Sequence, residues 1–142
     1  MKTSNTMTKP QVFISYSYSG SDLQWLQQFV RSLEENGVKT WFIDNEVRPG
    51  DSFLEAMEKG MRDSDIFVFL LNEKSLNRKN QNIFFELGAA IGMGKRIIGI
   101  VTDDMDISLL PQPFRIRKCL TQKSPEETAM EVAAATIDEV QE

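Results

Sequence analysis

The chain lacks histidine and has a single cysteine, Cys119, among its 142 residues. Without histidine, the commonest metal ligand is missing, and so is the base of Ser-His and Cys-His nucleophilic catalysis. One cysteine cannot form an internal disulfide. Any catalysis must therefore depend on carboxylates, and we expect neither a metal site nor a bound cofactor.

Long apolar runs and clusters of basic residues are also missing. The longest apolar stretches fall well short of the roughly 20 residues that cross a bilayer, so no membrane span is expected. Residues 1–10 are polar and lack the apolar segment of a secretory signal, and we interpret them as a short disordered lead. A formal charge of −5 without a basic run argues against nucleic acid as a direct partner. We expect a cytoplasmic protein.

The chain does contain an alternation of strand and helix patterns. Segments rich in β-branched and aromatic residues predict strands at 12–17, 38–43, 66–71, 96–101 and, more briefly, 116–120. The segment 66–71, IFVFLL, is apolar throughout, as in a strand buried on both faces, and is expected at the centre. Helical patterns separate the strands. This order predicts an α/β fold with a doubly wound parallel sheet of about five strands and helices on both faces, formed by residues 11–142 as one domain.

The predicted helices have recognisable start and stop signals. Caps are expected at Ser19 or Ser21, at Asp51 or Ser52, and at the capping box that begins with Ser124, while Gly37 and Gly92 or Gly94 mark helix ends. Apolar residues at helical spacing are expected to face the core: Leu23, Leu26, Phe29, Val30, Leu33, Leu54, Met57, Met61, Phe84, Leu87, Ile91, Met130, Ala133, Ala134 and Ile137. The aromatic residues expected in the core are Trp41, Phe42 and Phe53.

Ligands of open parallel sheets bind beyond the carboxyl ends of the strands. In this chain those ends are followed by loops after Ser17, Ile43, Leu71 and Val101. Tyr16 and Tyr18 lie two residues apart near the first of these loops. We expect one of them to face the core, and favour Tyr18 as the one near the ligand.

Three stretches, in this order, resemble the Toll/interleukin-1 receptor (TIR) domain family, particularly its bacterial branch: VFISYSYSGSD, GVKTWFIDNEVRPGDSF and FELGAAIGMGKRIIGIV. The resemblance covers about residues 11–101. It implies a flavodoxin-like fold. In the enzymatic members it also implies cleavage of NAD+ to nicotinamide and ADP-ribose or a cyclic isomer.

The resemblance also implies roles for particular residues. Glu86, directly before a leucine, corresponds to the catalytic glutamate of the family. The positions that line NAD+ correspond to Ser17 and Tyr18 after the first strand, and to Asp44 and Arg48 in the loop after the second. One helical turn before Glu86 stands Asn82, where enzymatic relatives often carry tryptophan. Asn82 can hydrogen-bond the substrate or the carboxylate, but it cannot stack on a ring.

One carboxylate suffices for this reaction. Nicotinamide leaves as a neutral molecule, so no general acid is needed, and a carboxylate can stabilise the oxocarbenium-like centre and deprotonate the incoming nucleophile. Glu86 lies between Phe85 and Leu87 on an apolar helix, so we expect partial desolvation to strengthen its interaction with a cation.

The leading hypothesis is therefore an NAD+ nucleosidase, acting as a glycohydrolase or cyclase in prokaryotic antiphage or immune signalling. By resemblance, it is expected to self-associate through TIR–TIR contacts, filaments included, and to respond to a sensor domain or partner protein. Two alternatives remain: a noncatalytic TIR adaptor, favoured by Asn82, and an enzyme similar to nucleoside deoxyribosyltransferases, against which the RPGDS loop argues.

Overall fold

The computed structural model describes residues 9–16, 20–42, 49–50, 52–72 and 82–141. Side chains at 20–22, 53, 82 and 137–141 are not described. In chain order the elements are β1 (Gln11–Ser15), α2 (Gly20–Glu35), β2 (Lys39–Trp41), α4 (Phe53–Asp63), β3 (Ile66–Leu71), α5 (Asn82–Gly92), β4 (Arg96–Val101), the 3-10 helix η1 (Ile107–Leu109), α6 (Gln112–Arg115), β5 (Leu120–Thr121) and α7 (Pro125–Gln141).

The strands form one parallel sheet in the order β2-β1-β3-β4-β5. This is the flavodoxin-like order, so the predicted fold class is confirmed, with β3 in the centre as its apolar sequence indicated. After β1, the chain forms β2 on one side of that strand, and it later forms β3 on the other side of β1. The strand order therefore reverses between β1 and β3.

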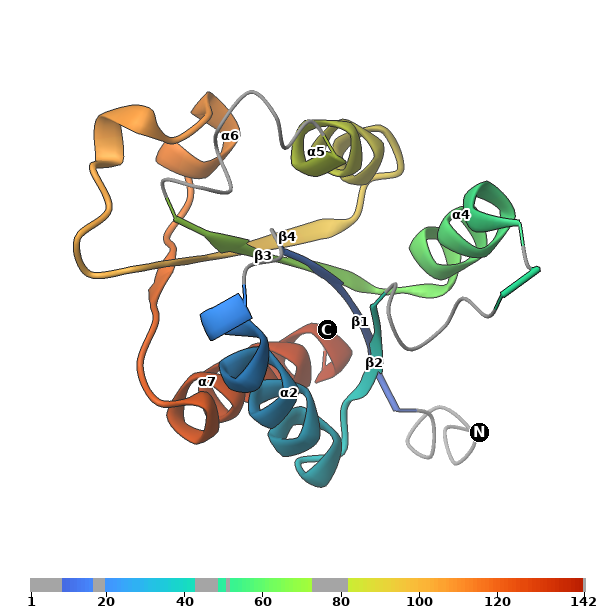
Figure 1. Ribbon diagram of the computed structural model, residues 1–142, viewed down its shortest axis with the longest axis horizontal. Helices are drawn as coiled ribbons and strands as arrows, with labels where there is room; N and C mark the ends of the chain where they lie inside the picture. The colour runs from blue at the N-terminus through green and yellow to red at the C-terminus, as the bar shows by residue number, and fades with distance from the viewer. Residues whose placement is uncertain (1–8, 17–19, 43–48, 51, 73–81, 142) are drawn as a thin grey trace.

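Helices cover both faces of the sheet. Figure 1 shows α2 and α7 on one face and α4, α5 and α6 on the other. Each face has its own apolar core, because successive side chains of a strand point to opposite sides. In β3, for example, Ile66 and Val68 pack toward α2 and α7, whereas Phe67 and Phe69 pack toward α4, α5 and α6.

A stack of aromatic rings fills the core beneath α4. Phe13 lies between Trp41 and Phe67, with ring centroids 4.9 Å and 4.7 Å away. The helix approaches this stack through Gly60, since a Cβ atom there would lie 2.4 Å from Cε2 of the Trp41 ring. Glycine at this position allows the helix backbone to lie directly on the indole. The expectation that Trp41 and Phe42 are core residues is confirmed.

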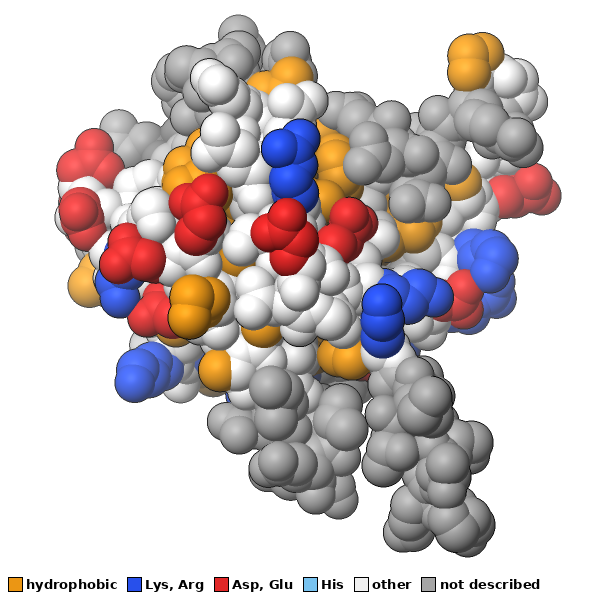
Figure 2. All heavy atoms as spheres, turned by 90° about the horizontal axis from the view of Figure 1, so that it is seen from below, with side chains coloured by type: hydrophobic (Ala, Val, Ile, Leu, Met, Phe, Trp, Pro, Cys, Tyr) orange, Lys and Arg blue, Asp and Glu red, His pale blue; other side chains and the backbone are white. Residues whose placement is uncertain are grey.

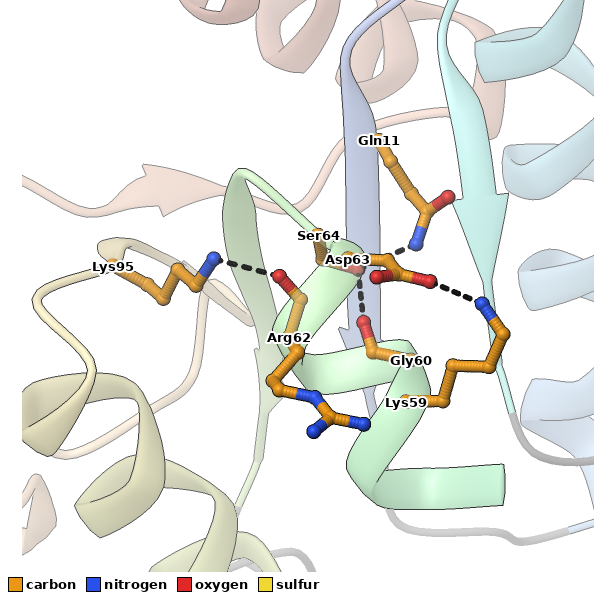
Figure 3. A network of polar contacts seen from close by, with 7 residues as sticks. All are labelled: Gln11, Lys59, Gly60, Arg62, Asp63, Ser64 and Lys95. Carbon is orange, nitrogen blue, oxygen red and sulfur yellow. Dashed lines mark hydrogen bonds and ion pairs between the residues drawn. The ribbon is translucent and has the colours of Figure 1, made fainter. Parts of the chain in front are cut away.

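Polar contacts fasten the end of α4 to the amino ends of the strands (Figure 3). The buried Ser64 hydroxyl donates to the Gly60 carbonyl oxygen at 2.7 Å and accepts from Nε2 of Gln11 at 3.0 Å. Nearby, Nζ of Lys95 donates to the Arg62 carbonyl oxygen at 3.0 Å. These bonds satisfy backbone and side-chain groups where the helix ends. They lie at the amino ends of the strands, on the side of the sheet away from the strands' carboxyl ends.

The helix faces differ from the sequence prediction in several places. On α5 the buried residues are Ile83, Glu86, Leu87 and Ala90, whereas Phe84 and Ile91 are exposed. The helix is apolar around most of its circumference, so the spacing of apolar residues alone could not identify the inner face. Leu54 on α4 and Met130 and Ala134 on α7 are also exposed, against expectation. Ile137 and Phe53 carry side chains outside the described set.

The other differences concern element ends. The fifth strand consists of Leu120–Thr121 instead of 116–120, because α6 occupies 112–115 and Ile116 caps that helix. Ser52 caps α4 by accepting from the Glu55 amide, while Asp51 lies outside the described residues. Ser124 caps α7 as predicted, since its hydroxyl accepts from the Glu127 amide at 3.1 Å; the Glu127 carboxylate accepts from the same hydroxyl at 3.0 Å, in place of the Ser124 amide that a full capping box would use.

Candidate functional site

Ser15 ends β1 at the point where the strand order reverses. It lies opposite Phe69 of β3 in the parallel register. Period two along β1 places Ser15 on the same side of the sheet as Phe13, toward α4 and α5. The residue is almost fully buried, with 2% of its surface exposed. The carboxyl end of a strand at such a reversal is where ligands bind in open α/β sheets.

Glu86 meets Ser15 from the helix above. It belongs to the inner face of α5, where Ile83, Leu87 and Ala90 pack against the same side of the sheet. Only 7% of its surface is exposed, so the expected desolvation of this side chain is found. Burial raises the pKa of the Glu86 carboxyl from its ordinary value of 4.5 to about 7. Near neutral pH the group is therefore poised between its acid and carboxylate forms.

The Ser15 hydroxyl is the described group that opposes this effect. It lies close to the Glu86 carboxyl and lowers its pKa, by less than burial raises it. Even so, the hydroxyl oxygen makes no hydrogen bond of good geometry with a described group. The site thus combines a buried carboxyl with a neighbouring buried hydroxyl whose hydrogen-bonding capacity is not fully used.

The other predicted site residues fall largely outside the described residues. Ser17, Tyr18, Asp44 and Arg48 are among those the structure does not describe. Asn82 is the first residue of α5, one turn before Glu86, and its side chain is likewise not described. The roles inferred for these five residues and for Glu86 therefore stay predictions.

Ser15 was missed by the sequence analysis. The available signal was period two along β1, which places a polar residue at the inward position that follows Phe13. The neighbouring Tyr16 points to the opposite face, where it packs on the core beneath α2 and meets the Phe42 ring edge-on, with centroids 6.0 Å apart. One tyrosine of the Tyr16 and Tyr18 pair therefore faces the core, as expected.

The described residues form no cluster of metal-ligating side chains, and the face that α2 and α7 cover carries charges of both signs (Figure 2). No group of three or more histidine, cysteine, aspartate or glutamate residues is close enough there to hold a metal ion. Figure 2 looks onto the face that α2 and α7 cover, where acidic side chains stand among the basic ones. None of the helices within the described ranges is both long and apolar enough to span a membrane.

Comparison with known proteins identifies the fold. The family model for the TIR domain matches residues 12–133. The TIR domain of the Toll-related receptor TRR-2 from Hydra magnipapillata is similar in structure, with a TM-score of 0.66 and 20% sequence identity over 92% of this chain and 98% of that one. No curated protein matches the sequence.

Two further solved structures share the fold at lower similarity. The TIR domains of the activated Roq1 resistosome, which directly recognises the pathogen effector XopQ, give a TM-score of 0.61 and 15% identity over 91% of this chain and 73% of that one. The CMP N-glycosidase BcmB from Clostridium botulinum gives a TM-score of 0.55 and 18% identity over 87% of this chain and 98% of that one.

Proposed function

The chain belongs to the TIR domain family, and we propose that it cleaves the bond between nicotinamide and ribose in NAD+, with Glu86 as the catalytic carboxylate. The observation that carries the proposal is the burial of Glu86 beside Ser15, at the reversal of strand order. A buried carboxyl on the inner face of a helix opposes folding when it is ionised, so its presence there calls for a functional reason.

The position suits the chemistry. NAD+ carries a positive charge on the nicotinamide ring, and the transition state moves positive charge onto the ribose. A carboxylate removed from water interacts more strongly with that charge than an exposed one does. Binding of the cation favours the ionised form of Glu86, and the same carboxylate accepts the proton of the attacking water or ribose hydroxyl. Nicotinamide departs as a neutral molecule, so no second acid is needed to protonate the leaving group.

The comparison with an N-glycosidase supports the reaction class. BcmB, similar in fold and not in sequence, is a CMP N-glycosidase, which breaks a bond between a base and a ribose. The same sheet and helix arrangement can thus hold an N-glycosidic substrate. The choice of NAD+ over a nucleotide such as CMP rests on the family resemblance of Glu86 and of the segments around it.

Turnover of NAD+ at high protein concentration tests the proposal. Release of nicotinamide is measured for the natural chain, for Glu86→Gln, and for Glu58→Gln as a matched control at an exposed glutamate of α4. We expect a loss of at least 100-fold in Glu86→Gln and an unchanged rate in Glu58→Gln. Equal turnover in Glu86→Gln and the natural chain would remove Glu86 from the catalytic role.

We also propose that activity requires self-association through TIR–TIR contacts. The support is the family membership and the presence of TIR domains in the Roq1 resistosome. A second copy is predicted to complete the site or to order the loop around Arg48 and Pro49. Specific activity should then rise with protein concentration, whereas constant activity across a wide dilution series would contradict the requirement.

Two other functions compete. A noncatalytic adaptor is favoured by Asn82, which stands where enzymatic relatives often carry tryptophan. No turnover in the natural chain at any concentration, together with retained TIR–TIR association, would favour it. A nucleosidase acting on nucleotides or deoxynucleosides is favoured by the fold of BcmB. A substrate panel of NAD+, CMP and deoxynucleosides separates that function from the leading one.

A further inference from the structure

Ser15 is unusual among the buried polar residues of the described structure. The hydroxyls of three of the others each have a hydrogen-bond partner: Ser64 donates to the Gly60 carbonyl, Thr136 donates to the Ala133 carbonyl, and Thr128 accepts from the Lys123 amide. Ser15 is as deeply buried but has no hydrogen bond of good geometry within the described residues. Buried polar groups are nearly always paired, so an exception needs an explanation.

Packing alone does not explain a serine here. Alanine would occupy almost the same volume and would leave no hydroxyl without a partner. The neighbours of Ser15 along β1 are apolar, and the facing residue of β3 is Phe69. The surroundings of Ser15 therefore favour an apolar side chain over a hydroxyl. The polar neighbour of this hydroxyl is the Glu86 carboxyl.

We infer that Ser15 is a positioning residue, whose hydroxyl donates to the Glu86 carboxylate and holds it ionised and oriented toward the reacting bond. The inference deepens the proposed function and rests on it for the reaction. The hydroxyl hydrogen can rotate about the Cβ–Oγ bond, so the donor can turn to the carboxylate without movement of the chain. Its support is the sheet, because Ser15 pairs with Phe69 of β3, and residues 11–13 of the same strand also pair with β2.

The Ser15 hydroxyl matters because few described groups affect the pKa of Glu86. Burial raises the pKa of the carboxyl, and Ser15 is the described group that lowers it. Among the described residues, no lysine, arginine or second carboxyl on β1, β3 or α5 contributes to that pKa. Loss of the hydroxyl should therefore shift the acid–base equilibrium of Glu86 without compensation from another described charge.

Titration of the Glu86 side-chain carboxyl by ¹³C NMR tests the inference directly. The variants are Ser15→Ala, Ser15→Thr, which keeps a hydroxyl on a β-branched side chain suited to a strand, and the control Ser64→Ala, which removes a buried hydroxyl at the opposite edge of the sheet. We expect the pKa of Glu86 to rise by about one unit in Ser15→Ala, since a hydrogen bond to a charged group is worth that much. Ser15→Thr should restore it and Ser64→Ala should leave it unchanged.

The pH profile of kcat/KM provides the second readout. In Ser15→Ala the acidic limb should move to higher pH by the same amount, so activity falls about tenfold near pH 6 and approaches that of the natural chain near pH 9. A purely structural role would lower activity equally at all pH values. If threonine overpacks the site, Ser15→Cys keeps a weaker donor and should give an intermediate pKa.

The two readouts separate failure of this inference from failure of the proposed function. An unchanged Glu86 pKa in a folded Ser15→Ala variant would overturn the role of Ser15, whatever the activity. A raised pKa in a chain that does not cleave NAD+ would support the link between Ser15 and Glu86 while removing NAD+ cleavage as the proposed function.

Discussion

Replacement of Glu86 by glutamine should stabilise the domain in a manner that depends on pH. The pKa of the carboxyl is raised from 4.5 to about 7 on folding, so the fold prefers the protonated side chain. That preference favours folding fully below pH 4.5, and it is lost as the pH rises through about 7. Glutamine imitates the neutral acid at every pH. The free energy of unfolding of Glu86→Gln should therefore equal that of the natural chain at low pH and exceed it at high pH.

The size of the effect follows from the same pKa values. A pKa change from 4.5 to about 7, at about 1.36 kcal/mol for each pKa unit, amounts to about 3 kcal/mol at pH 8 and above. For a domain of this size that corresponds to a rise in Tm of roughly 10 °C. Near pH 5.7 the difference in the free energy of unfolding should be about half as large.

Urea denaturation of the natural chain and of Glu86→Gln at intervals from pH 4.5 to 8.5 measures the difference. Glu58→Gln, at an exposed position of α4, serves as the control and should differ little from the natural chain at any pH. A stability difference between Glu86→Gln and the natural chain that is flat across this range would refute the argument, because it would mean that the Glu86 carboxyl is not desolvated by folding.

Three substitutions elsewhere test the packing and the caps. Gly60→Ala should destabilise the domain by about 1–3 kcal/mol in urea titrations, since its Cβ would lie 2.4 Å from the Trp41 ring. Gly88→Ala, also inside a helix but with no atom within 4 Å of the new Cβ, should instead stabilise by about 0.5–1 kcal/mol; the same sign for both would contradict the packing argument. Ser124→Ala removes the cap on the Glu127 amide and should lower the free energy of unfolding by about 1 kcal/mol, and an unchanged melting curve would show that the cap contributes nothing.

Strand positions could be predicted well because their signals are local. IFVFLL is apolar in every position and became the central strand, β3, at the predicted residues 66–71. The segment 96–101 was likewise placed without error. The fifth strand was harder, because only two residues pair with β4 and the preceding apolar residue, Ile116, closes a short helix instead. A pairing of two residues leaves no pattern of its own in the sequence.

Helix faces were predicted less well, for a physical reason. A stripe of apolar residues identifies the inner face only when the remaining positions are polar. On α5 nearly all positions are apolar, and the interior takes Ile83 and Ala90 while Phe84 and Ile91 stay exposed. The buried set also includes the one acid of the helix, Glu86. Hydrophobic spacing cannot indicate the burial of a charged group, so this position was recognised through its family resemblance.

Of the candidate site, the sequence supplied Glu86 but not its neighbour. A serine at the end of an apolar strand carries no distinctive pattern, and the significance of Ser15 depends on contact with a helix about 70 residues further along the chain. Such contacts follow from the crossover connections of the sheet, which fix which helix covers which strand end. The proximity of Ser15 to Glu86 could therefore be inferred only after the topology was known.

The sheet divides the interior into two separate compartments. Ser15 and Glu86 belong to the side covered by α4, α5 and α6, while α2 and α7 close the other. A protein that binds the outer surface of α2 or α7 would contact no residue of the core on the side of Glu86. Ser15, the last residue of β1, faces the side of Glu86, while the next residue, Tyr16, packs into the core on the side of α2 and α7, so the carboxyl end of this strand meets both cores.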